Sequence, residues 1–134
     1  MRELIASLNI QYRGKWKNVH NDSSTLDMGG GKALVFTTDS FTVDPIFFPG
    51  GDIGKIAASG TINDLAMSGA TPLFISVSFI IEEGLELEVL GKIVRSVKST
   101  AERAGVEIVT GDTKVVERGA CDRIFINTSG IGAV

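Results

Sequence analysis

Residues 52–81 read DIGKIAASGTINDLAMSGATPLFISVSFII, and this stretch decides the fold. Asp52 is a good N-cap for a helix over about residues 53–68, and Gly69 ends that helix. Residues 73–81 then alternate as a strand, with one face wholly apolar and the other half apolar. A helix followed by such a strand predicts a sheet that is covered by helices on one face and by another surface on the other.

The flanking sequence extends this pattern in both directions. Residues 2–9 are expected to form one or two helical turns, and residues 43–51 a loop. The remaining expected elements are strands over 24–28, 33–38, 106–110 and 123–134, and a helix over 87–104. This order predicts an α+β domain with both helices on one side of a mostly antiparallel sheet.

The second face of that sheet needs cover. Phe74, Ile80, Phe125 and Ile131 would fall on it, and such an apolar surface indicates a partner subunit or a further domain. Residues 1–134 are expected to form a single domain. Because the sequence stops at Val134, within or beside a strand, we expect a domain boundary in a longer protein.

Composition excludes several classes of protein. The net charge of −3 arises from mixed signs without a basic block, which argues against nucleic-acid and membrane-surface binding. No apolar run approaches the roughly 20 residues that span a bilayer. One cysteine and one histidine cannot build an internal disulfide or a Cys/His zinc site. A cytoplasmic protein is expected, with Cys121 as a spectator thiol in a polar turn.

Carboxylates at the ends of elements carry the chemical signal. Asp22 precedes a strand, Asp39 ends one, Asp64 lies on the first helix, and Asp112 is expected in a turn after a strand. If these ends converge, they form an oxygen-ligand cluster suited to Mg²⁺ and a polyphosphate. The alternative, that each is a turn or cap residue, has equal weight. For Asp52 capping is the favoured role.

Other residues give weaker signals. Asn63 and Asp64 are poor choices inside an apolar helix unless they face a shared polar site. Lys55 in the first helical turn opposes the helix dipole, which hints at an anionic ligand. Lys114 is either an acid/base group or a solvated lysine. The pair Phe47-Phe48 fits a flap over a ligand and an interface equally well.

Three segments carry a family resemblance. Residues 44–55 (DPIFFPGGDIGK), 63–72 (NDLAMSGATP) and 110–115 (TGDTKV) resemble the HypE family of hydrogenase-maturation proteins. The Asn-Asp-Leu and Gly-Ala-x-Pro elements are shared with its superfamily, the PurM-like proteins. These include aminoimidazole ribonucleotide synthase, selenophosphate synthetase and thiamine monophosphate kinase. The Phe-Phe-Pro-Gly-Gly-Asp segment selects HypE within that group.

The resemblance implies an ATP-binding domain that forms a homodimer, in which two four-stranded sheets close into a barrel. It implies that ATP and Mg²⁺ are held by acidic residues, with Asn63 nearby and Lys114 in the chemical step. The residues matching the metal ligands are Asp22, Asp39, Asp64 and Asp112.

HypE-like proteins use ATP to dehydrate a thiocarboxamide on their own C-terminal cysteine. The product is a thiocyanate, the source of the cyanide ligand of [NiFe]-hydrogenase, and the partners are HypF and HypC/HypD. This sequence lacks the family's glycine-rich start, its second domain and its terminal cysteine, and it has Asn21 where an aspartate is common. We therefore expect this chain alone to be inactive. The alternatives are a non-catalytic dimerisation or partner-recruiting fragment, and another ATP-dependent kinase or synthetase of the superfamily.

Overall fold

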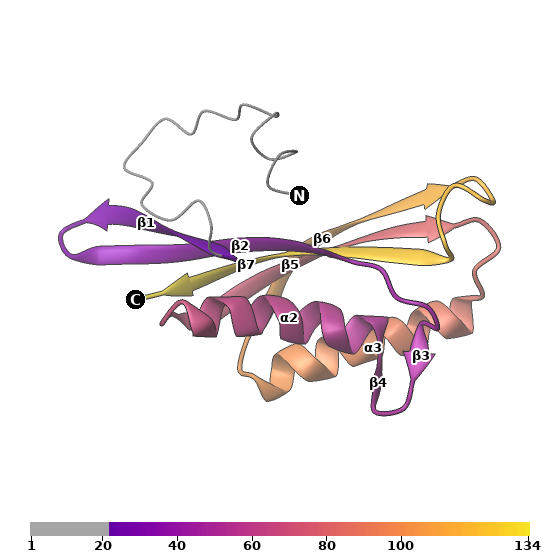
Figure 1. Cartoon of the computed structure of the whole chain (residues 1–134), viewed down its shortest axis with the longest axis horizontal. Helices are drawn as coiled ribbons and strands as arrows, with labels where there is room; N and C mark the ends of the chain where they lie inside the picture. The colour runs from indigo at the N-terminus through magenta and orange to yellow at the C-terminus, as the bar shows by residue number, and fades with distance from the viewer. Residues whose placement is uncertain (1–21) are drawn as a thin grey trace.

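The computed structural model describes residues 22–134 (Figure 1). The helical turns expected over residues 2–9, and Asn21, lie outside the described residues. The main sheet has five strands in the order β1-β2-β7-β5-β6. Their bounds are β1 Ser23–Gly29, β2 Lys32–Phe41, β5 Thr71–Glu82, β6 Glu107–Val116 and β7 Ile124–Ala133.

Two helices, α2 Ile53–Met67 and α3 Leu87–Arg103, cover one face of this sheet (Figure 1). Helix α2 begins where Asp52 accepts a hydrogen bond from the Lys55 amide, and it ends before Gly69, whose φ is +77°. Helices α2 and α3 pack closely at Gly54, where an added Cβ would lie only 2.4 Å from the Ile93 carbonyl oxygen. The α+β class, the mostly antiparallel sheet and the one-sided helices are thus confirmed.

The core fills the space between the helices and the sheet. Strands β2, β5 and β7 contribute alternate buried residues to it, and each helix contributes one stripe. The largest fully buried apolar side chains are Ile53, Leu65, Ile75, Ile93, Ile124, Ile126 and Val35.

The main sheet has five strands, as the five strand segments expected from the sequence require, rather than the four that the family resemblance implied. Strand β6 runs over Glu107–Val116, so the expected strand over 106–110 is too short. Asp112 therefore lies within a strand and not in a turn after it. The Gly-Asp pair suggested a turn, but Gly111 is needed for another reason: a Cβ there would lie 2.3 Å from the Val77 carbonyl oxygen. Gly111 comes shortly after an irregularity in β6, where the pairing register with β5 shifts between Ile75 and Ser76.

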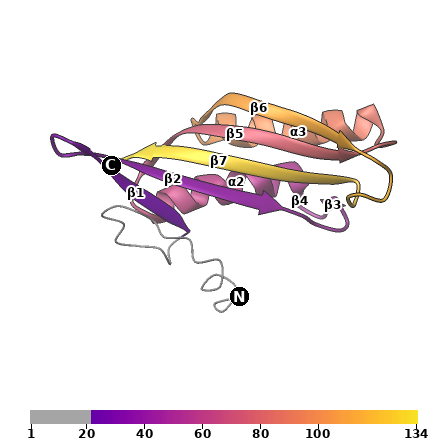
Figure 2. The ribbon, with the colours of Figure 1, turned by 90° about the horizontal axis from the view of Figure 1, so that it is seen from above.

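The opposite face of the sheet, the open face, is not covered by any described helix (Figure 2). Phe36, Phe74, Ile80 and Ile131 on this face are each 38–41% exposed. The segment expected to be a loop over residues 43–51 contains a small hairpin, with β3 at Phe47–Phe48 and β4 at Gly51–Asp52. In residues 22–134 no helix is long and apolar enough to cross a membrane.

Candidate functional site

Two of the predicted site residues meet between the sheet and α2. Asp39 lies near the end of β2 and pairs with Thr128 of β7, whose buried side chain points at α2. Asp39 therefore faces the helices, because paired residues share a face of the sheet. Asp64 reaches the same point from α2, within hydrogen-bonding distance of the Asp39 side chain. Asp22, just before β1, adds a third negative charge near Asp64.

Small polar side chains fix this acidic cluster of Asp22, Asp39 and Asp64. Thr61 of α2 and Thr128 of β7 form a buried hydroxyl pair one helical turn before Asp64. Ser23 and Ser68 form a second pair, and it joins the start of β1 to the end of α2. Thr37, which is buried, donates a hydrogen bond of 2.6 Å to the Asp22 carbonyl oxygen. The three carboxylates thus come from elements that are tied to one another.

The electrostatics of the cluster are repulsive. Burial, a hydrogen bond with Asp39 and the charges of Asp39 and Asp22 raise the pKa of Asp64 from 3.8 to about 6. Among residues 22–134 these carboxylates form no ion pair with a lysine or arginine. Close carboxylates disfavour one another's charged form, so a bound cation would stabilise the cluster.

The donor set fits Mg²⁺ in the way that nucleotide enzymes use it. Within residues 22–134 no group of three or more acidic, His or Cys side chains could hold a metal ion by itself. Mg²⁺ is usually bound by one or two carboxylates together with phosphate oxygens and water. Asp39 and Asp64 supply that number of carboxylates and leave the remaining positions to a phosphate ligand.

Asp112 and Lys114 are not brought to this cluster. Asp112 pairs with Ser78, which pairs with Asn127 on the open face, so strand alternation places Asp112 on that face as well. Lys114 pairs with Ile80 and shares the face. Strands β7 and β5 separate them from Asp39 (Figure 2). Within one chain, the four predicted metal ligands therefore form a cluster of three and one distant residue.

The other predicted ligands on α2 also lie apart from the cluster. Asn63 is exposed beside Asp64. Lys55 lies nine residues before Asp64, roughly 13 Å along the helix axis. Its Nζ donates a 2.7 Å hydrogen bond to the Gly50 carbonyl oxygen in the β3–β4 turn, which explains a lysine in the first helical turn without a ligand.

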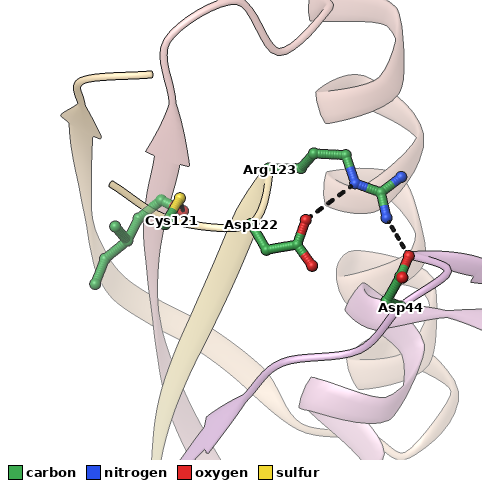
Figure 3. Close-up of polar contacts among 5 residues, drawn as sticks. Asp44, Cys121, Asp122 and Arg123 are labelled. Atoms are coloured by element: carbon green, nitrogen blue, oxygen red, sulfur yellow. Dashed lines mark hydrogen bonds and ion pairs between the residues drawn. The ribbon is translucent and has the colours of Figure 1, made fainter. Parts of the chain in front are cut away.

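At that end of the molecule the carboxylates have partners. Asp52 is buried and accepts hydrogen bonds from the Lys55 amide (2.9 Å) and the Ser96 hydroxyl of α3. Asp44 forms an ion pair of 2.6 Å with Arg123, whose Nε lies 3.7 Å from Asp122 (Figure 3). The capping role expected for Asp52 is confirmed.

Cys121 lies beside this ion pair but does not take part in it (Figure 3). Its side chain is buried although the surrounding turn is polar. Burial raises the pKa of the Cys121 thiol, which disfavours the reactive thiolate. These properties agree with a spectator thiol.

A hollow of about 930 Å³ lies away from the acidic cluster, between α3 and β6. Its lining is mostly apolar and includes Val94, Val97 and Val109, with Lys98 and Glu102 among the charged residues. Asp112 contributes to the lining, whereas Asp39 and Asp64 do not.

Several residues that shape the cluster were not predicted from the sequence. Thr37, Thr61 and Thr128 carry no motif of their own, and only their position on the face that meets α2 would have indicated a role. Gly130 pairs with Thr37, and a Cβ there would lie 2.7 Å from Thr61 Cγ2 and 2.9 Å from Leu65 Cδ1. A glycine inside a predicted strand is a signal for such close approach.

Comparisons with known proteins identify the family of this chain. The family model "AIR synthase related protein, N-terminal domain" matches residues 20–134. The carbamoyl dehydratase HypE of Escherichia coli K12 is 50% identical over 139 residues, which cover 100% of this chain and 41% of that protein. This chain thus spans about two fifths of the length of that relative.

Solved structures give the same assignment. The HypE–HypF complex contains a chain that is 52% identical with a TM-score of 0.86, covering 99% of this chain and 41% of that one. A HypE structure in complex with ATP is 54% identical with a TM-score of 0.75, covering 91% and 36%. The chain therefore belongs to the family of AIR synthase related proteins, N-terminal domain, and within it matches the N-terminal domain of HypE.

Proposed function

We propose that this chain is the ATP- and Mg²⁺-binding, dimer-forming domain of a cytoplasmic HypE-type carbamoyl dehydratase. The observation that carries the proposal is the acidic cluster, in which the Asp39 and Asp64 side chains lie within hydrogen-bonding distance of each other and, within residues 22–134, form no ion pair with a lysine or arginine. The solved HypE structure in complex with ATP supports the nature of the ligand. Residues 1–134 form one domain in this proposal, and a second domain outside this chain completes the active site.

The roles of the residues follow from their positions. Asp39 and Asp64, with Asp22 beside them, would hold Mg²⁺, which neutralises phosphate charge when it is bound. Asn63 lies next to Asp64 and would contact the nucleotide. Asp112, Lys114 and Lys55 lie elsewhere in the single chain, so their roles as metal ligand, acid/base group and nucleotide contact require surfaces from a partner or from a second domain.

The reaction we propose removes water from a thiocarboxamide that is bound to a cysteine outside this chain. The amide oxygen attacks the γ-phosphorus of ATP, and ADP leaves. The nitrogen then loses its two protons and the C–O bond breaks, which gives thiocyanate and phosphate. Lys114 is our candidate for accepting a proton.

Titration calorimetry with Mg-ATP tests the binding role. We expect saturable, magnesium-dependent binding by this chain, weakened at least tenfold by Asp64→Asn. Asp44→Asn is the matched control, because it removes an exposed carboxylate at the other end of the molecule. Equal binding by wild type and Asp64→Asn would refute the assigned site. In the full-length protein, unchanged ATP turnover in Asp64→Ala would refute it as well.

The open face supports a homodimer. A strand rises about 3.4 Å per residue and neighbouring strands lie about 4.8 Å apart, so this face has an area of roughly 800 Å². One partner buries about the same area, about 800 Å², in a standard protein–protein interface. Sedimentation should show a dimer that Phe74→Ser dissociates. Met67→Ser, which changes an 86% exposed residue on α2, should not. A wild-type monomer at all concentrations would refute the dimer.

HypF is the first partner we propose, because a HypE relative forms a complex with it. HypC and HypD are proposed from the family resemblance alone. If this chain forms a dimer and binds HypF but not Mg-ATP, the alternative of a partner-recruiting fragment is favoured.

A further inference from the structure

The side chain of Asn127 reaches the backbone of Asp39 from the opposite face of the sheet. Asn127 lies on β7 and pairs with Ser40 of β2 on the open face. Its Nδ2 donates hydrogen bonds to the Asp39 carbonyl oxygen (2.8 Å) and to Ser40 Oγ (3.0 Å). The Asp39 side chain points the other way, towards α2 and Asp64.

Neighbouring hydroxyls strengthen this attachment of β2 to β7. Ser129 Oγ lies 3.0 Å from Thr38 Oγ1, and Thr38 Oγ1 donates to the Thr128 carbonyl oxygen at 3.1 Å. The hydrogen bonds therefore engage both residues that flank Asp39. Among them, only the bond from Asn127 reaches the backbone of Asp39 itself.

Asp39 needs this support because, in the described chain, β1 does not pair with β2 at this position. In the described chain, the pairing of β1 with β2 extends only to Ser23 and Thr37. Asp39 lies two residues beyond that pair, so β7 alone holds it within the sheet. A strand held on one side moves more easily than one held on both.

We propose that Asn127 is a positioning residue, which holds Asp39 at the distance from Asp64 that a divalent cation requires. This inference rests on the proposed function, in which Asp39 and Asp64 bind Mg²⁺ with ATP. Asn127 does not touch the ligand in this account and acts through the backbone of β2.

The experiment compares wild type with Asn127→Ala and Ser129→Ala. Ser129→Ala is the matched control, because it removes a hydroxyl from the same face and strand without a bond to the Asp39 backbone. Hydrogen exchange reports the mobility of the amides at 39–41, and calorimetry reports the affinity for Mn²⁺ in the presence of ATP. A chemical unfolding midpoint for each variant identifies global destabilisation.

For Asn127→Ala we expect faster exchange confined to residues 39–41 and an affinity lower by about three- to tenfold, the effect of one hydrogen bond. Ser129→Ala should retain the wild-type affinity. If Asn127→Ala does not fold, Asn127→Asp replaces it: the added negative charge favours cation binding, so a loss of affinity there shows positioning.

Each contrary outcome has a separate meaning. Wild-type affinity in the variants at Asn127 overturns the positioning role and leaves the proposed function intact. An equal loss in Ser129→Ala also overturns it, because a general weakening of the strand would then explain both. If wild type itself binds no Mn²⁺ with ATP, the proposed function of this chain fails, and this inference fails with it.

Discussion

The carboxylates at the two ends of α2 have opposite environments. At its start, Asp52 is satisfied by an amide and a hydroxyl, and Asp44 nearby is neutralised by Arg123. Towards its end, Asp64 meets Asp39 and the charge of Asp22. The difference separates acidic residues that stabilise the fold from the acidic residues that we propose bind a cation. Asp52, Asp39 and Asp64 look alike in the sequence, where each follows a glycine, threonine or asparagine.

Removing a carboxylate from the acidic cluster should have the largest effect on function. Asp39→Asn in a full-length HypE protein carrying this domain should lower kcat/KM for ATP at least about 100-fold, because a metal ligand is lost. Steady-state ATP turnover measures this. Asp44→Asn should stay within about twofold of wild type, and a loss as large as that of Asp39→Asn would erase the distinction between the two ends.

Removing Asp52 should have the largest effect on stability. Asp52→Ala loses the N-cap of α2 and leaves the Ser96 hydroxyl without its partner, at a cost of about 2 kcal/mol in the free energy of unfolding. Urea denaturation measures this. Ser96→Ala should cost about half as much. If Asp64→Asn destabilised the domain as strongly as Asp52→Ala, the cluster would have a structural role.

The pH dependence of stability should reflect the raised pKa of Asp64, which is caused first by burial and then by the neighbouring carboxylates. The pKa of Asp64 is about 6 in the folded domain and 3.8 as its ordinary value, so the folded state binds more protons between these limits. The contribution of Asp64 is therefore most favourable below about pH 4 and is lost as the pH rises through 6.

Asp64→Asn should consequently be more stable than wild type at pH 7, by the order of 1 kcal/mol after solvent screening, and should lose this advantage near pH 4. Thermal unfolding of both proteins from pH 4 to 8 measures the difference. Excess Mg²⁺ with ATP should stabilise wild type at pH 7 more than the variant. A difference in stability between the two proteins that stays constant across the pH range would contradict the raised pKa of Asp64.

The ion pair between Asp44 and Arg123 should matter least. Both side chains are well exposed, so Asp44→Asn should change the free energy of unfolding by about 0.2–1 kcal/mol, and less at high salt. Urea denaturation at two salt concentrations measures this. Asp122→Asn, which removes the longer contact of 3.7 Å, should have a smaller effect still.

Local signals allowed much of the fold to be predicted. The N-cap at Asp52 and the stop at Gly69 defined α2 because such signals act within a few residues. Strand β5 followed from its alternation. Strand β6 was predicted too short because Gly111-Asp112 has the composition of a turn, while its actual requirement is the close approach to Val77 of another strand. The β3–β4 hairpin was missed because each of its strands has only two residues.

The site was predictable only in part, because proximity in space depends on register and face. Asp39 and Asp64 were both chosen from the sequence, and the structure places them together. Asp112 carried the same local signal, yet the order of the strands places two strands between it and Asp39, and Asp112 lies on the opposite face. The support from Thr37 and Asn127 was not predicted, because hydrogen bonds across neighbouring strands leave no motif in either strand.

The missing side chain of Gly130 has a consequence for the acidic cluster. Gly130 lies beneath Thr61 and Leu65, both of which are fully buried. One added methyl group at this position would lift α2 away from β2 and carry Asp64 with it. The distance between the Asp39 and Asp64 carboxylates therefore depends on how closely α2 packs against the backbone of β7 at Gly130. The same distance determines how strongly the two carboxylates repel each other and how tightly they could bind a small cation.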